Sequence, residues 1–324
     1  MDDQVIKFYR AVKDSLDAYG PGLCMAKWYQ TTLHLENGHN HSCHHPRTHQ
    51  VPLDELSRNV SALHNTEYKK SVRKSMLSGQ KPEECRYCWN IEDTVQKQNL
   101  VSDRVLKSGW EVKHNPDIVK KTVDRGPWAD AFPTQLEVSF STKCNFKCSY
   151  CSADVSSRWM NELVKYGEYP TEFPLITLEQ IRRDNKMPIP DREPNPYVDA
   201  FWAWWPDLVK QLRVFRITGG EPLLHRDTYK ILDYLLENPQ PQLNLAINSN
   251  LCIPKKVFDR FVEKAQQVVE QGNIESFTIY TSCEAQGAHA EYIRHGLDYT
   301  QWLNNCDILL KSIPSLKISL MSTY

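Results

Sequence analysis

The amino-acid sequence predicts an α/β protein, in which a parallel sheet alternates with helices and is preceded by a smaller, cysteine-rich α+β region. Three observations support this prediction. Short apolar runs recur from residue 135 onward, helical periodicity fills the intervals between them, and the cysteines fall into one group before residue 93 and another directly after the first apolar run. We therefore expect three regions, at residues 1–93, 94–133 and 134–324.

Composition narrows the class of protein. The 324 residues carry a formal net charge of −1 and are 40% hydrophobic, which allows sizeable cores but gives no electrostatic footprint for nucleic acid. No apolar run approaches the length of a membrane span, and the charged start MDDQVIKFYR lacks the core of a signal peptide. Ten cysteines without an export signal indicate a cytoplasmic protein that uses thiols for metal ligation.

The region before the sheet has mixed signals. Helical spacing of apolar residues over 5–19 predicts a first helix, which Gly20 and Pro21 end. A ribbon-like stretch follows at 28–36, and helical patterns return over 53–77. The residues from 93 to 133 are polar and weakly periodic, so we expect a connector there.

Five apolar runs predict the strands of the sheet. They lie at 135–141, 212–218, 242–248, 276–281 and 315–321. A helical run over 257–269, closed by Gly272, is typical of the helices between them, and four prolines over 187–196 indicate an inserted loop. Functional residues of such sheets gather after the carboxyl ends of the strands.

The most informative motif follows the first of these strands. Cys144, Cys148 and Cys151 are separated by three and by two residues. Three thiolates can hold three irons of a 4Fe–4S cluster and leave the fourth iron open for a ligand. The alternative from spacing alone is a zinc site completed by a histidine.

This spacing, with Tyr150 directly before the third cysteine, resembles the cluster motif of the radical S-adenosylmethionine (SAM) superfamily. The segment RITGGEP at 216–222 also looks like the GGEP loop of that superfamily. The resemblance implies a partial (β/α)6 barrel of the TIM type, with five of its strands visible here. Because the sequence stops at the end of an apolar run, we also expect that the barrel is incomplete at its C-terminus.

The resemblance implies a role for each matching residue. The three cysteines would ligate the catalytic cluster, and the methionine part of SAM would chelate its fourth iron. The GGEP loop would contact the SAM amino group through its backbone, since glycines permit close approach. The other expected SAM contacts are an aromatic residue near adenine, a polar motif for the ribose, two asparagines in the same region and an arginine that pairs with the carboxylate. The full set is Tyr150, Gly219, Gly220, Glu221, Pro222, Asn248, Asn250, Ser282, Glu284 and Arg294. The two asparagines can equally be turn formers, and Arg294 a surface ion-pair partner.

A second set of cysteines precedes the sheet: Cys24, Cys43, Cys85 and Cys88. Their spacing, with Gly38 between the first two, resembles the SPASM or shortened twitch domains, which bind an auxiliary iron–sulfur cluster. Four thiolates can fill a closed cluster, and they can equally form a structural zinc site. The histidines around Cys43 are additional candidate ligands or belong to a solvated loop.

Together these resemblances imply a radical SAM enzyme with an auxiliary cluster. One electron, from a donor such as flavodoxin or ferredoxin, would enter the catalytic cluster and cleave SAM to a 5′-deoxyadenosyl radical. That radical would abstract hydrogen from a substrate, for which a peptide or protein side chain is the first expectation. The alternatives are a non-catalytic protein that binds zinc at both cysteine sets, and an inactive fragment of a radical SAM enzyme.

Overall fold

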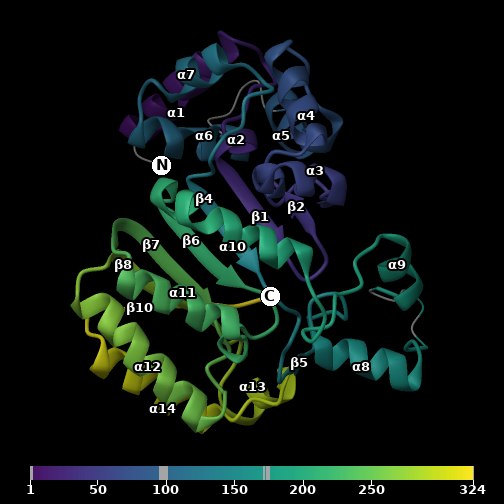
Figure 1. Ribbon diagram of the computed structural model, residues 1–324, viewed down its shortest axis with the longest axis vertical. Helices are drawn as coiled ribbons and strands as arrows, with labels where there is room; N and C mark the ends of the chain where they lie inside the picture. Colours follow the sequence, from purple (N-terminus) through teal and green to yellow (C-terminus); the bar gives the residue numbers. More distant parts are fainter. Residues whose placement is uncertain (1–2, 95–100, 171, 173–175, 324) are drawn as a thin grey trace. The chain divides into compact units, whose positions relative to one another are not determined.

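The computed structural model describes residues 3–94, 101–170, 172 and 176–323 (Figure 1). The chain forms two compact units. The first comprises Met1–Leu33, His39–Gln135 and Ala200–Gln211, and the second comprises His34–Gly38, Leu136–Asp199 and Leu212–Tyr324. None of the described helices is long and apolar enough to span a membrane.

The second unit is built on a sheet, and five strands of this sheet confirm the five expected positions. In the order in which they lie, they are β10 (Lys317–Met321), β8 (Ile274–Ser282), β7 (Gln240–Asn248), β6 (Val214–Thr218) and β4 (Gln135–Ser139). The pairs from β6 to β10 are parallel. Their register aligns Ile217 with Ile247 and Ile279, which gives the sheet a buried aliphatic row on one face.

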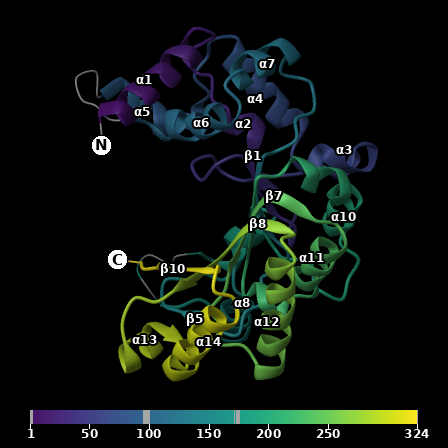
Figure 2. The same cartoon turned by 90° about the vertical axis from the view of Figure 1, so that its left-hand side faces the viewer.

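Helices cover that apolar face. They are α11 (Arg226–Glu237), α12 (Lys255–Glu270), α13 (Gly287–Ile293) and α14 (Tyr299–Ser312). Helix α12 packs against α11, α14 and β8 (Figures 1 and 2), and its buried stripe of Phe258, Phe261, Ala265 and Val268 has helical spacing. The insert between β4 and β6 contains α8 (Ser157–Tyr166) and α9 (Leu178–Arg183).

The opposite face of the sheet is polar and only half-buried. Strand alternation places Arg216, Asn248 and Tyr280 on this face, because each directly follows a buried apolar residue that points to the helices. The polar face and the loops at the carboxyl ends of the strands together form the surroundings of the cysteine motif.

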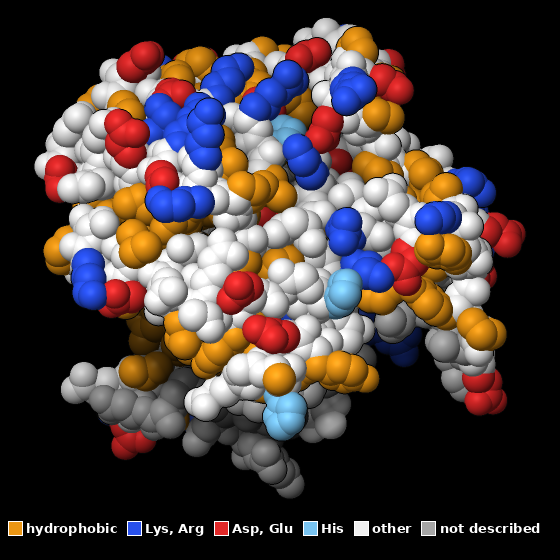
Figure 3. All heavy atoms as spheres, turned by 90° about the horizontal axis from the view of Figure 1, so that it is seen from below, with side chains coloured by type: hydrophobic (Ala, Val, Ile, Leu, Met, Phe, Trp, Pro, Cys, Tyr) orange, Lys and Arg blue, Asp and Glu red, His pale blue; other side chains and the backbone are white. Residues whose placement is uncertain are grey.

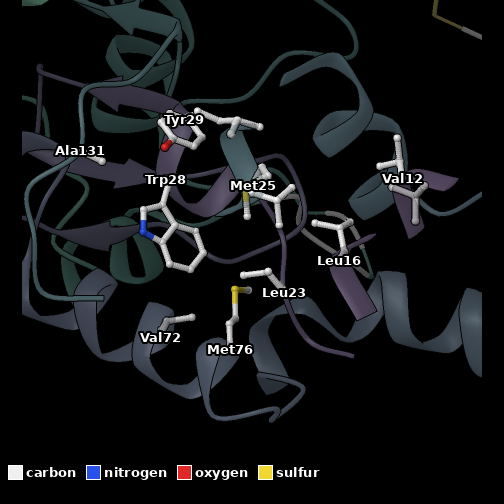
Figure 4. Packing of buried hydrophobic residues seen from close by; sticks show 12 residues of the cluster. Val12, Leu16, Leu23, Met25, Trp28, Tyr29, Val72, Met76 and Ala131 are labelled. Atoms are coloured by element: carbon white, nitrogen blue, oxygen red, sulfur yellow. The ribbon is translucent and has the colours of Figure 1, made fainter. Parts of the chain in front are cut away.

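The first unit is mostly helical. Its elements up to residue 94 are α1 (Asp3–Asp17), α2 (Ala26–Tyr29), β1 (Gln30–His34), β2 (His39–His41), β3 (His49–Gln50), α3 (Leu53–Arg58), the 3-10 helix η1 (Val60–Leu63), α4 (Glu67–Leu77), the 3-10 helix η2 (Glu83–Cys85) and α5 (Arg86–Thr94). Leu23, Trp28 and Met76 meet in the core (Figure 4). The expected first helix is present as α1, which buries only Val12 and Leu16.

The region at 94–133, which was expected to be a connector, differs most from the prediction because it contains two helices. Residues 103–125 form helices α6 (Asp103–His114) and α7 (Ile118–Arg125), which contribute Val105, Ile118 and Val119 to the first core. The polar residues that concealed this pattern pair internally: the buried guanidinium of Arg104 donates to Asp17 (2.9 Å) and Glu92 (2.8 Å). Residues 95–100 of the expected connector lie outside the described residues.

A distant segment also joins the first unit. Helix α10 (Pro196–Leu208) and the 3-10 helix η3 (Val209–Gln211) contribute residues 200–211 to it. Phe201, Trp204 and Trp205 are buried, and the rings of Phe132 and Trp204 lie 5.8 Å apart. The periodicity of the local sequence cannot predict that residues 200–211 belong to the first unit, because the residues that they pack against are far away in the sequence.

One glycine provides a test of packing in the second unit. Gly38 has φ +76°, and an added Cβ would lie 2.0 Å from the ring of Tyr197, whereas Gly167 has φ +82° and open space around it. We expect Gly167→Ala to lower the free energy of unfolding by about 1 kcal/mol through backbone strain alone. Gly38→Ala should lower it by about 1–3 kcal/mol more, because the new methyl group also overpacks.

Urea unfolding of both variants checks this prediction. Equal losses for Gly38→Ala and Gly167→Ala would show that the contact with Tyr197 does not constrain the turn.

Candidate cluster and cofactor site

The three cysteines of the motif lie in one loop that follows β4. The Cys144 N–H donates to Ser157 Oγ (3.1 Å), and the Cys151 N–H donates to the carbonyl of Cys148 (3.0 Å). Cys148 lies in the short strand β5 (Lys147–Cys148), which pairs with β9 (Arg294–His295) and places Cys148 opposite Arg294. The surrounding protein therefore anchors the loop at Cys144 and Cys148, and a hydrogen bond within the loop positions Cys151.

The GGEP loop packs directly on this cysteine loop. The Gly220 N–H donates to the carbonyl of Ser141 (3.1 Å), and the Glu221 N–H donates to that of Lys143 (2.7 Å). A Cβ on Gly220 would lie 2.4 Å from the Lys143 carbonyl oxygen. The sequence analysis attributes these glycines to close approach by SAM. The structure shows a different requirement, because the protein's own cysteine loop occupies the space that a side chain would need.

Glu221 joins the loops that follow β6 and β7. Its Oε1 accepts hydrogen bonds from the Leu223 N–H (3.0 Å) and the Ser249 hydroxyl (2.8 Å), and its Oε2 accepts one from the Asn250 N–H (2.6 Å). Burial raises the pKa of this carboxyl to about 7, although these hydrogen bonds oppose the shift. Because both oxygens have protein partners, contact with a cofactor falls to the backbone of this loop.

Two asparagines continue the same network. Asn250 donates through Nδ2 to Asn145 Oδ1 (2.8 Å), and Asn145 donates through Nδ2 to the carbonyl of Cys252 (2.7 Å). Asn145 lies between the first two cysteines, so this bridge positions the cysteine loop. Of the two expected roles, the turn-forming role fits Asn250. Sequence reasoning missed Asn145, whose importance arises only from this contact between loops.

Asn248 and its neighbours line the polar face of the sheet. Its Oδ1 accepts a hydrogen bond from Arg216 Nε (2.8 Å). The Arg216 guanidinium also lies 4.3 Å from the ring centroid of Tyr280 and 3.7 Å from Glu137 Oε2. Arg216 was part of the GGEP motif but had no predicted role, and it now emerges as a fixed cation on the half-buried face.

Pro222 and Ser282 occupy contrasting places. Pro222 is buried at the start of the 3-10 helix η4 (Pro222–Leu224), and its carbonyl accepts from Thr228 Oγ1 (2.6 Å). Ser282 ends β8 in register with Met321 and is half-buried. Thus Pro222 shapes the loop, whereas Ser282 lies at the carboxyl edge of the sheet, where a ligand could reach it.

The buried side chains of Glu284 and Arg294 form a polar group with the partly exposed Tyr150 beside the cysteine loop. The Arg294 Nη1 lies 3.7 Å from Glu284 Oε1 and donates to the Tyr150 hydroxyl, and both charged side chains are less than one-tenth exposed. The two Glu284 oxygens and Arg294 Nε lack a hydrogen bond of normal geometry. Such buried groups suit a ligand with both donors and acceptors, as the ammonium, carboxylate and hydroxyl groups of SAM would provide.

The thiols of this motif are protonated without a metal. Burial raises the pKa of the Cys144 thiol to about 12 and also raises those of Cys148 and Cys151, while Arg294 opposes the shift at Cys148. Metal ligation requires thiolates, so a cluster would have to displace these protons. Arg294 favours that change at Cys148, because its charge stabilises the anion.

The second set of cysteines lies in the first unit. Cys24 precedes α2, Cys43 follows β2, Cys85 ends η2 and Cys88 lies in α5. Burial is the largest cause of the raised pKa values of Cys24, Cys85 and Cys88, and the negative charge of an ionised Cys43 raises all three further. The four thiols thus share one electrostatic environment. Among the described residues, no three Cys, His, Asp or Glu side chains form a ready-made metal site.

Buried cations surround these thiols. Lys27 is paired with Glu84, and Lys69 donates to His64 Nδ1 (2.9 Å). Lys69 and Arg73 are at most 1% exposed, and no carboxylate among the described residues forms an ion pair with either. Burial lowers the pKa of Lys69 well below its usual value, because an ammonium group without an anionic partner is costly to bury, and an ionised Cys43 opposes this shift. The cysteines are acidic groups that could supply the missing negative charge once they bind a metal.

The histidines near Cys43 mostly have protein partners. His45 Nε2 lies 2.8 Å from Asp103 Oδ2, His49 Nε2 lies 2.9 Å from Thr66 Oγ1, and His39 Nδ1 lies 3.1 Å from Thr48 Oγ1. Burial lowers the pKa of His49 to about 3, so it stays neutral. These rings are therefore structural groups and do not form the expected solvated loop.

Comparison with known proteins agrees with this geometry. A family model described as "Radical SAM superfamily" matches residues 138–323, more than half of the chain. The protein belongs to the radical SAM superfamily. This membership implies a 4Fe–4S cluster and SAM as cofactors, and an enzyme that needs an electron donor.

Curated relatives are similar over a limited part of the chain. A GTP 3′,8-cyclase from Sulfurimonas denitrificans is 28% identical over 120 residues, which are 37% of this chain and 28% of that protein. A GTP 3′,8-cyclase from Staphylococcus epidermidis is 30% identical over 103 residues, which are 31% of this chain and 22% of that protein. The match thus spans about a quarter of these relatives. No solved structure gives a significant match.

The raised pKa of Glu221 predicts a pH-dependent stability. Because the unfolded carboxyl ionises near its usual 4.5 and the folded one near 7, the unfolded state releases its proton first as pH rises. The free energy of unfolding of the metal-free protein should therefore fall by up to about 3 kcal/mol as the pH rises from 4.5 to 7. The free energy of unfolding of Glu221→Gln should not depend on pH in this way. At pH 5 this variant should be less stable than the wild type by about 1–3 kcal/mol, because the amide nitrogen cannot accept one of the hydrogen bonds that the carboxyl accepts.

Urea unfolding at stepwise pH measures both effects. Glu275→Gln, which removes an exposed carboxylate from β8, controls for the change in net charge. If the free energies of unfolding of the wild type and Glu221→Gln changed equally across this pH range, Glu221 would not be the titrating group.

Proposed function

We propose that Cys144, Cys148 and Cys151 hold the catalytic 4Fe–4S cluster and that the adjoining buried polar group binds SAM. The observation that carries this proposal is the juxtaposition of the cysteine loop with Glu284, Arg294 and their unsatisfied polar atoms. When bound and reduced, this pair of cofactors supplies a 5′-deoxyadenosyl radical that removes hydrogen from a substrate.

The chain's residues have distinct tasks in this proposal. Arg294 would pair with the SAM carboxylate, and Glu284 with its ammonium or ribose hydroxyls. Tyr150, whose hydroxyl is held by Arg294, would pack near adenine. The backbone of Gly219 and Gly220 would line the methionine moiety, and Ser282 would contribute at the sheet edge. Glu221, Asn250 and Asn145 would position the cysteine loop through their hydrogen bonds between loops.

For the substrate we propose a peptide or protein side chain, because the cysteines of the first unit are spaced like the twitch module, and domains related to that module often act on peptides or proteins. A nucleotide is the second candidate. Two observations favour it: the curated relatives are GTP 3′,8-cyclases, and Arg216 lies over Tyr280 on the polar face of the sheet. Anaerobic assays with both substrate classes separate the candidates, because deoxyadenosine production should rise only with the true one.

For the first unit we propose an auxiliary iron–sulfur cluster at Cys24, Cys43, Cys85 and Cys88. Support comes from the shared electrostatic environment of the thiols and from the buried basic side chain of Lys69, whose pKa an ionised Cys43 raises and which has no carboxylate partner among the described residues. A metal centre with four thiolates is anionic and would favour the charged form of this lysine. We further propose a reducing cytoplasmic setting, where all ten free cysteines stay reduced.

Alanine at Cys144, Cys148 or Cys151 should abolish SAM cleavage while the fold survives, because each change removes one of three iron ligands. Deoxyadenosine production by the anaerobically reconstituted enzyme is the measurement, and Cys306→Ala in α14 is the matched control. Cleavage at the wild-type rate by any variant of the triplet would contradict the assignment. A colourless protein with zinc at both sites would support the non-catalytic alternative, and a protein with both clusters but no cleavage would support the inactive fragment.

The double variant Cys85→Ala/Cys88→Ala should lose about four irons, because it removes two ligands of the auxiliary cluster. The catalytic cluster should still bind, since its ligands are untouched. Iron and sulfide analysis decides the matter, with Cys283→Ala/Cys306→Ala as the control for removal of two thiols. Unchanged iron with a loss of zinc would make this a structural zinc site.

A further inference from the structure

A basic hollow lies on the helix side of the cysteine loop. It has a volume of about 750 Å³ and is lined by Lys143, the turn at 223–226, Tyr229 and one end of α12. Lys143 directly precedes Cys144, and its carbonyl accepts the hydrogen bond from the Glu221 N–H. The hollow therefore reaches the backbone that carries the first cysteine.

Positive charge dominates this hollow. Its lining includes Lys143, Arg226, Lys256 and Arg260, against only Asp259 and Glu263. Asp259 is already paired with Lys255 at 2.6 Å. Lys143, Lys256 and Arg260 have no carboxylate partner among the residues that the structure describes. The chain as a whole has a net charge of −1, so this excess is local.

One of these cations is held in place. The Arg260 guanidinium lies 4.2 Å from the ring centroid of Tyr229, whose hydroxyl donates to the carbonyl of Leu223 (3.0 Å). The ring is thus fixed to the GGEP side of the site, and the cation lies above it. The face in Figure 3 shows charged side chains of both signs interspersed with apolar ones.

The hollow does not overlap with the proposed SAM contacts. Tyr150, Arg294 and Glu284, which would contact SAM according to the proposed function, are not among the described residues that line it. An electron donor seated in the hollow would therefore not need to displace SAM from these side chains. Its lining residue Lys143 directly precedes a cluster ligand.

We propose that this basic hollow is the docking site of an acidic protein that donates single electrons to the catalytic cluster. The inference rests on the proposed function of the cysteine triplet. Complementary charge accelerates encounter and orients the partners, and redox complexes typically use small interfaces. Unpaired lysine and arginine side chains around one loop fit such a transient partner.

Charge reversal tests the proposal. Lys256→Glu/Arg260→Glu should weaken binding of a purified acidic flavodoxin by at least about tenfold at low ionic strength. Fluorescence anisotropy measures binding, and stopped-flow absorbance measures cluster reduction by flavodoxin hydroquinone. Binding and reduction by flavodoxin hydroquinone should both be weaker in the double variant than in the wild type, whereas the rate of reduction by dithionite should be unchanged. Arg182→Glu/Arg183→Glu on α9 makes the same change in net charge elsewhere and should bind flavodoxin nearly as well as the wild type.

Lys256→Glu alone, which leaves the contact of Arg260 with Tyr229 intact, should give an intermediate loss of binding. Equal binding by the wild type and the double variant would overturn the proposal, and so would an equal loss in the α9 control. Failure of the underlying function is distinguishable, because a chain that assembles no cluster at the triplet lacks the iron signal whether or not flavodoxin binds.

Discussion

The buried carboxylate of Glu221 is the constraint on which the geometry of the site depends. It accepts hydrogen bonds from Leu223, Ser249 and Asn250, so the loops after β6 and β7 cannot move independently. The neighbouring backbone of Gly220 and Glu221 holds the segment before Cys144. Burial makes ionisation of this carboxyl costly, whereas three donors favour it, and the resulting pKa near 7 reflects that opposition.

Local signals in the sequence were sufficient for the strands and the cysteine motif. Each strand of the sheet is a short apolar run, and each predicted position coincides with an observed strand. The contacts of Gly220 and Asn145 could not be predicted, because they arise where loops from different strands meet. A glycine motif indicates close approach, but only the fold shows that the Lys143 carbonyl is what approaches.

The expected connector failed for a related reason. Its apolar positions are few, since α6 buries the charged side chains of Arg104 and Glu111 as well as Val105. Arg104 is 1% exposed and is neutralised by Asp17 and Glu92, which lie 87 and 12 residues away in sequence. Hydropathy treats such a residue as a surface group, so a segment stabilised by internal ion pairs looks like a linker. Local sequence patterns likewise could not predict that residues 200–211 belong to the first unit.

Charge balance gives the two cysteine sets a common physical logic. Beside the triplet, Arg294 opposes the raised pKa of Cys148, and Lys27 does the same for Cys85 in the first unit. In both places a buried cation favours the thiolate that a metal needs, although burial of the thiol acts against it. The first set also has the buried basic side chain of Lys69, and basic side chains line the hollow that includes Lys143, the residue before the triplet. Positive charge that is buried stabilises an anionic centre, whereas positive charge that remains in solvent is free to attract a partner.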